Sequence, residues 1–188
     1  SVTLNISSFT VFIYKFVAVG NSGTILTSTD GTTWTSRTSG TSNNLGNVTY
    51  GNSTFMAVGG SGTIITSSDG IIWTSKTSGT SENLWDVAYG NSTWVANGDN
   101  GTIISSSDGT SWDNRTSGTT VEFNELLYGN STFIAAGDNG TILTSSDGTS
   151  WTTRTSGTSN RLDGITYANS TFVAGGASGT ILTSNQTA

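Results

Sequence analysis

One unit of 39 residues repeats along this chain, and it constrains the fold more than any other feature. Each copy contains an aromatic residue at the same place, and these residues follow one another at intervals of 39: Phe16, Phe55, Trp94, Phe133 and Phe172. Repetition near 40 residues, with short alternating segments and many glycines, is typical of a β-propeller in which each unit forms a four-stranded blade. The sequence therefore predicts an all-β, five-bladed β-propeller occupying residues 1–188 as a single domain.

The third copy shows the strands expected within one unit. Apolar and β-branched residues alternate over four short segments, separated by turns rich in Gly, Asn, Asp and Ser. These segments predict strands at Leu84–Tyr89, Trp94–Asn97, Thr102–Ser106 and Trp112–Thr116. The first of them is expected to line the central channel.

A Ser-X-Asp-Gly-X-X-Trp motif joins the third and fourth expected strands of each complete copy. It occurs at Ser28–Trp34, Ser67–Trp73, Ser106–Trp112 and Ser145–Trp151. An Asp before Gly in a hairpin turn accepts backbone N–H bonds, and the Trp that follows can pack into the blade. Because a functional site is normally unique whereas fold supports recur with the repeat, we interpret these residues as structural: Asp30, Asp69, Asp108 and Asp147, with Trp34, Trp73, Trp112 and Trp151.

The motif resembles the Asp-box of bacterial-neuraminidase-type repeats, although it is one residue shorter between Asp and Trp. With Gly-Thr-Ile-Leu before it and Trp-Thr-X-Arg-Thr-Ser-Gly after it, the unit looks more similar to the propellers of photosystem II assembly factors and their bacterial relatives. The resemblance covers nearly the whole chain and implies the propeller fold. It implies little about function, because propellers include sialidases, lectins, assembly factors and passive scaffolds.

The first and last copies depart from the repeat. In the last copy Ser184 matches Ser145, but 185–188 replace the Asp-Gly turn and lack a Trp, so the fifth blade is predicted to be one strand short. In the first copy Phe12–Lys15 replace the Gly-Asn-Ser-Thr turn. Residues 1–14 are therefore a candidate ring-closing or strand-exchange segment: Ser1–Leu4 could close the ring against the fifth blade, or Ser1–Tyr14 could complete the open blade of a neighbouring copy.

Composition excludes several classes of chemistry. The chain has no Cys and no His, which argues against zinc, copper and His-dependent nucleophilic sites, so no cofactor, metal or catalytic residue is predicted. A net charge of −6, with six scattered Lys and Arg residues, lacks the basic surface that nucleic-acid binding requires. The longest apolar stretch, Phe9–Val19, is too short to span a bilayer.

Positions where the copies disagree are the best candidates for a ligand site, because each copy serves as a control for the others. Most of these differences fall in and just before the expected inner strand, and they predict a ligand site at one mouth of the channel: Trp85, Asp86, Glu122, Glu125, Arg161 and Asp163. Trp85 could stack on a sugar there, whereas the residues do not match a sialidase site. The alternative is that these positions contact only solvent and vary between copies without binding any ligand. Asp99–Gly101 and Asp138–Gly140 could also bind calcium, but Asp or Asn before Gly is usual in a hairpin turn, so the turn is the favoured interpretation.

Asn-X-Ser/Thr sequons are unusually dense in this sequence. They occur at Asn5, Asn47, Asn52, Asn91, Asn100, Asn114, Asn130, Asn139, Asn169 and Asn185. Four of them fall at the tips of the regular turns between the first and second strands, where an acceptor would be accessible. The pattern favours an extracellular or cell-surface glycoprotein.

Together these features predict a non-catalytic structural or adhesive propeller whose partners are copies of itself, in an oligomer or filament joined by strand complementation. A carbohydrate-binding propeller, with glycans as partners, is the first alternative. A protein-binding assembly factor is the second.

Overall fold

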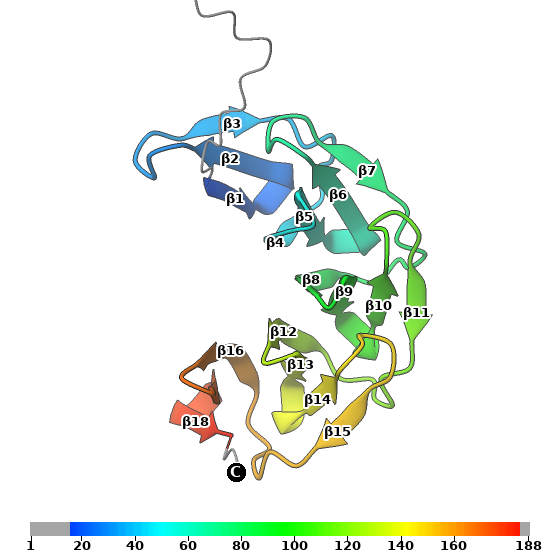
Figure 1. Ribbon diagram of the computed structural model, residues 1–188, viewed down its shortest axis with the longest axis vertical. Coiled ribbons are helices and arrows are strands. Elements are labelled where there is room, and N and C mark those ends of the chain that lie inside the picture. The colour runs from blue at the N-terminus through cyan, green and yellow to red at the C-terminus, as the bar shows by residue number, and fades with distance from the viewer. Residues whose placement is uncertain (1–15, 185–188) are drawn as a thin grey trace, which may run out of the picture.

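The protein forms an arc of five antiparallel sheets. A computed structural model of the chain describes residues 16–184, and Figure 1 shows the sheets following one another around a common centre. Within each sheet the strands pair in sequence order, and β4, β8, β12 and β16 lie at the inside of the arc. The five-bladed β-propeller prediction is thus confirmed. In the described part of the chain no helix is long and apolar enough to cross a bilayer.

The strand boundaries follow the predicted unit to within one or two residues. The first two blades consist of β1 (Phe16–Gly20), β2 (Thr24–Ser28), β3 (Thr35–Arg37), β4 (Leu45–Gly51), β5 (Thr54–Gly59), β6 (Thr63–Ser67) and β7 (Thr74–Lys76). The third and fourth blades consist of β8 (Leu84–Gly90), β9 (Thr93–Gly98), β10 (Ile103–Ser106), β11 (Asp113–Arg115), β12 (Phe123–Gly129), β13 (Thr132–Gly137), β14 (Ile142–Ser145) and β15 (Thr152–Arg154). The fifth consists of β16 (Leu162–Ala168), β17 (Thr171–Gly176) and β18 (Thr180–Thr183). A short 3-10 turn joins β1 to β2 in the first blade and the second strand to the third in each of the others: η1 (Asn21–Gly23), η2 (Gly60–Gly62), η3 (Asp99–Gly101), η4 (Asp138–Gly140) and η5 (Ala177–Gly179).

The two end blades contain three strands each in the described residues. The fifth blade, β16-β17-β18, lacks the outermost strand, as the sequence predicted. The first blade, β1-β2-β3, has no inner strand within residues 16–184, and the arc is open between β1 and β16 (Figure 1). The predicted ring-closing or strand-exchange segment, residues 1–14, lies outside the described residues, as do 185–188.

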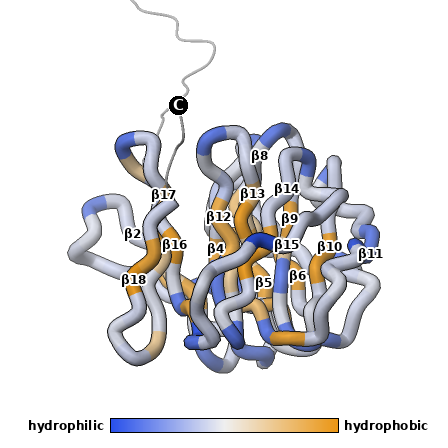
Figure 2. The backbone as a smooth tube through the Cα atoms, turned by 90° about the horizontal axis from the view of Figure 1, so that it is seen from below, coloured by the Kyte–Doolittle hydropathy of each residue, from blue (hydrophilic) through white to orange (hydrophobic). Residues whose placement is uncertain are grey.

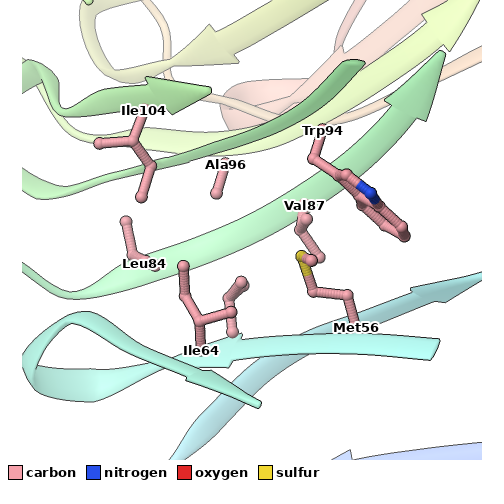
Figure 3. Close-up of a cluster of buried hydrophobic side chains, with 8 residues drawn as sticks. Met56, Ile64, Leu84, Val87, Trp94, Ala96 and Ile104 are labelled. Carbon is pink, nitrogen blue, oxygen red and sulfur yellow. The ribbon is translucent and has the colours of Figure 1, made fainter. Parts of the chain in front are cut away.

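The hydrophobic core lies between successive blades rather than in one central mass. Figure 3 shows one such layer, where Met56 and Ile64 of the second blade meet Leu84, Val87 and Trp94 of the third, all at most 2% exposed. Alternate residues of a strand point to opposite faces, so each blade can pack against both neighbours. Figure 2 accordingly shows hydrophobic segments along the strands and hydrophilic segments in many of the turns at both ends.

The Ser-Asp-Gly turns are held by their own side chains. In the third blade Asp108 Oδ1 accepts hydrogen bonds from the N–H groups of Thr110 and Ser111, each at 2.8 Å, and from Ser106 Oγ at 2.9 Å. These bonds, above all the one from Ser111 N–H, hold the pKa of Asp108 well below its usual range. The Asp108 carboxylate thus provides acceptors for backbone N–H groups of the turn, which supports the structural interpretation of the motif.

A glycine substitution provides a direct test of blade packing. Gly62 has φ +67°, and a Cβ there would overlap Thr80 O of the following linker, whereas Gly40 has φ +78° and open space around it. We expect Gly40→Ala to cost about 1–2 kcal/mol for the left-handed backbone, and Gly62→Ala to cost about 1–3 kcal/mol more because the linker must move. Urea unfolding of the two variants measures the difference. Equal losses would contradict the contact between η2 and the linker.

Candidate functional site

The six side chains predicted at the channel mouth divide into three pairs. A bulge interrupts the ladder near the start of each four-stranded blade's inner strand, between Leu84 and Asp86 in β8 and between Phe123 and Glu125 in β12. A bulge reverses the alternation of side chains along the strand. Trp85 therefore lies on the side of η3, whereas Asp86 turns into the interface between the third and fourth blades.

Asp86 is buried and bridges two inner strands. It is 3% exposed, its Oδ1 accepts from Val87 N–H at 2.7 Å, and its Oδ2 accepts from Leu126 N–H of the next blade at 2.6 Å. Burial, with a smaller effect of the nearby Glu125 carboxylate, raises the pKa of Asp86 to about 7. Desolvation also raises the pKa of Glu125. This pair is a structural element of the interface rather than an open ligand site.

An acidic hollow lies at η3 and η4, beside Trp85. Trp85 Nε1 donates to Asp99 Oδ1 at 2.6 Å, and Asn83 Nδ2 donates to Asp99 Oδ2 at 2.8 Å. Glu122 lines the same hollow, of about 520 Å³, together with Asp99 and Asp138. Desolvation in the hollow, followed by the carboxylates of Asp99 and Asp138, raises the pKa of Glu122, while Arg161 opposes the shift.

The sequence prediction missed Asp99 and Asp138 as members of this group. Both were read as turn residues, although the other copies have Asn21, Gly60 and Ala177 at the same position. That difference between copies was the signal that could have identified them.

The remaining predicted residues do not extend the hollow into a metal centre. Arg161 Nε and Asp163 Oδ1 form an exposed ion pair at 2.6 Å. Within residues 16–184 no three acidic side chains gather closely enough to hold a metal ion. Both oxygens of Asp99 already accept side-chain hydrogen bonds, from Trp85 and Asn83, and its backbone carbonyl accepts from Thr102 N–H, which closes the η3 turn.

Most of the predicted sequons in the described range lie on exposed surface. Asn52, Asn91, Asn130 and Asn169 are exposed at turns between the first and second strands, and Asn100, Asn114 and Asn139 are exposed as well. Asn47, in β4, is partly buried. Asn5 and Asn185 fall outside the described residues.

A largely apolar hollow lies between the fourth and fifth blades. It has a volume of about 430 Å³. It is lined by the face of the fourth blade that points toward the fifth blade, and by the face of the fifth blade that points back toward the fourth. The first face contributes Thr132, Ile134, Ile142 and Thr144, and the second contributes Ile165, Phe172, Ala174 and Leu182. We call this hollow the fifth-blade groove.

The same place in the preceding blade pair is filled by a Ser-Asp-Gly turn. The turn of the fourth blade packs closely against the third blade. A Cβ atom added to Gly148 of this turn would lie only 2.7 Å from Val95 Cγ2 and 3.1 Å from Thr93 Cγ2. One repeat later these positions are Ile134 and Thr132, which line the groove. The groove is therefore the space that a fourth strand and its turn occupy elsewhere.

The outer edge of β18 runs beside this groove with its backbone groups available. Ser184 N–H donates to Phe172 O at 2.9 Å, toward β17. Because successive residues of a strand direct their N–H groups to opposite edges, those of Thr183 and Ile181 point away from β17. Among residues 16–184 no strand pairs with this edge. The sequence predicted the open edge but not the apolar groove, which depends on the packing of two blades.

Comparison with solved structures places the chain among propellers. It is similar to a structure described as YCF48 bound to D1 peptide, with 20% identity, a TM-score of 0.67 and coverage of 93% of this chain and 61% of that one. YCF48 from Cyanidioschyzon merolae gives 17% identity, a TM-score of 0.66 and coverage of 89% and 65%. The WD40 propeller domain of Doa1 gives 14% identity, a TM-score of 0.69 and coverage of 90% and 60%.

These likenesses concern the fold. The chain spans about three fifths of the length of the propellers it matches. No protein-family model and no curated protein matches the sequence.

Proposed function

We propose that this chain is a non-catalytic, protein-binding propeller that takes up an extended segment of a partner protein as the fourth strand of its fifth blade. The observation that carries the proposal is the fifth-blade groove beside the unpaired edge of β18. Strand addition gains affinity from main-chain hydrogen bonds and specificity from side-chain pockets next to the edge. Both parts are present here.

The chain itself supplies the template for such binding. In the fourth blade β15 pairs antiparallel with β14, matching Arg154 with Ile142 and Thr152 with Thr144. One repeat later the matching acceptor residues are Ile181 and Thr183. The similar propeller YCF48 has been obtained with a bound peptide, which supports a peptide-binding role on this fold.

A single substitution at the edge tests the proposal. The probe is a labelled synthetic peptide with the sequence of residues 147–158, which contains the turn and fourth strand of the fourth blade. We expect it to bind the chain of residues 1–188, and Thr183→Pro to weaken binding at least about tenfold, because proline removes the outward N–H without breaking a bond to β17. Fluorescence anisotropy measures the affinity.

Thr116→Pro in the protein is the matched control, for which we expect unchanged affinity. Thr116 is exposed after the end of β11 in the third blade and does not line the groove. Unchanged affinity for Thr183→Pro, with circular dichroism like that of the parent protein, would show that the peptide does not add to β18.

Two other roles remain predictions. A glycosylated, extracellular protomer is supported by the exposed sequons, and mass spectrometry of native material tests both occupancy and oligomeric state. A sugar-binding role has less support, since the indole of Trp85 is already held by Asp99.

A further inference from the structure

The intact blades also indicate which side chains the bound segment should carry, an inference that rests on the proposed function. Each complete blade presents two side chains from the region of its fourth strand: the Trp that precedes the strand and the cation that ends it. If a foreign segment takes the same place at β18, it meets the same kinds of contact. The surroundings of these two side chains therefore describe the ligand.

An aromatic side chain is favoured by the apolar walls. Trp151 packs against the cluster formed by the third and fourth blades, which includes Val95 and Phe133. One repeat later the walls are Ile134 and Phe172, both lining the groove. Phe172 is only partly buried, whereas Phe133 is fully buried. An aromatic residue in the groove would cover Phe172 in the way that Trp151 packs against the cluster containing Phe133.

A cation is favoured at the other end of the segment. In three blades the Arg that ends the fourth strand donates through Nε to a hydroxyl on the third: Arg37 to Thr27 at 2.9 Å, Arg115 to Ser105 at 2.7 Å and Arg154 to Thr144 at 2.7 Å. The residue one repeat later is Thr183, which is exposed on β18. Its hydroxyl is positioned to accept from an incoming guanidinium.

The spacing between the two side chains is constant. The cation lies three residues after the Trp in every complete copy, as in Trp112 and Arg115 or Trp151 and Arg154. An incoming cation at Thr183 would repeat the placement of Arg115 at Ser105 and of Arg154 at Thr144, each within its own blade. The net charge of −6 also favours a basic segment over an acidic one.

We propose that the fifth-blade groove selects an extended segment of a partner protein in which an aromatic residue is followed three positions later by Arg or Lys. The aromatic side chain enters the groove over Ile134 and Phe172. The cation reaches the hydroxyl of Thr183, while the backbone pairs with the edge of β18.

Four peptides and one further protein variant test this selectivity. The probe with the sequence 147–158 is compared with versions carrying Trp151→Ala, Arg154→Gln or both. We expect the Trp151→Ala peptide to bind at least about tenfold more weakly, and the Arg154→Gln peptide about three- to fivefold more weakly. Thr183→Val in the protein keeps the backbone N–H and removes the hydroxyl, so it should abolish the difference between the Arg and Gln peptides.

The outcomes separate this inference from the proposed function. Equal binding of all four peptides, still weakened by Thr183→Pro, would overturn the side-chain selectivity and leave strand addition intact. A difference between Arg and Gln peptides that persists in Thr183→Val would overturn the position assigned to the cation. No binding of the probe, or binding insensitive to Thr183→Pro, would overturn both proposals.

Discussion

Replacing Trp94 with alanine is expected to lower the free energy of unfolding by about 3–5 kcal/mol, the range typical of a fully buried large aromatic side chain. Trp94 is 1% exposed and lies in the layer between the second and third blades, beside Met56 and Val87 (Figure 3). Its ring also contacts Tyr89, with centroids 4.7 Å apart. Truncation would leave a cavity that two rigid sheets cannot close.

Phe16 provides the matched control, because it occupies the same place in the first copy of the repeat. It is 51% exposed at the open end of the arc. Phe16→Ala should therefore cost less than about 1.5 kcal/mol, and urea unfolding of both variants measures the contrast. Similar losses at the two positions would mean that the first blade is covered in solution by something that buries Phe16.

The second large effect concerns the pH dependence of stability at Asp86. The folded protein raises the pKa of this carboxyl from 3.8 to about 7. Between about pH 4 and pH 7 the folded state therefore keeps a proton that the unfolded state has lost, so stability falls as pH rises through this window. A shift of this size corresponds to at most roughly 4 kcal/mol, and Glu125 contributes in the same direction.

Asp86→Asn should flatten this dependence, since an amide does not titrate. The second blade already has Asn47 at this position of the repeat, so the fold accepts the side chain. At pH 4 the variant should be less stable by about 1–3 kcal/mol, because its amide nitrogen leaves one of the N–H groups of Val87 and Leu126 without an acceptor. The difference should shrink or reverse by pH 8. Parallel stability curves from urea titrations at pH 4–8 would contradict the assignment.

Comparing the five copies of the repeat predicted site residues correctly only in part, because the surroundings of a side chain depend on the neighbouring blades as well as on its own copy. It identified Glu122, which lines the hollow at η3 and η4, and Trp85, which is hydrogen-bonded to Asp99 beside it, although it missed Asp99 and Asp138 in the same hollow. It also selected Asp86, whose variation reflects a buried contact with the next blade rather than a ligand site. A difference between copies indicates a changed environment, but the sequence does not say whether that environment is open or buried.

The sequence by itself determined the local structure of every blade. The Ser-Asp-Gly turn is held by hydrogen bonds within a few residues, as in Asp108 with Thr110 and Ser111, so any copy with these residues forms it. The alternation of apolar residues and the constant period then determined the number of blades in the described chain. The absence of the Asp-Gly turn after Ser184 likewise predicted a fifth blade with an open edge.

Only the tertiary structure decided what each repeated side chain contacts. Ile25, Ile64 and Ile103 are at most 1% exposed, whereas Ile181, at the same position of the repeat, is 74% exposed. Ile25, Ile64 and Ile103 each pack against the following blade. Among the described residues the arc has no blade beyond the fifth for Ile181 to contact (Figure 1). Burial is a property of two packed surfaces, so the same residue in the same strand is core in one copy and exposed in the last. The fifth-blade groove arises in the same way, because the sequence predicts the missing strand and only the packing of the fourth blade against the fifth gives the vacant space its apolar walls.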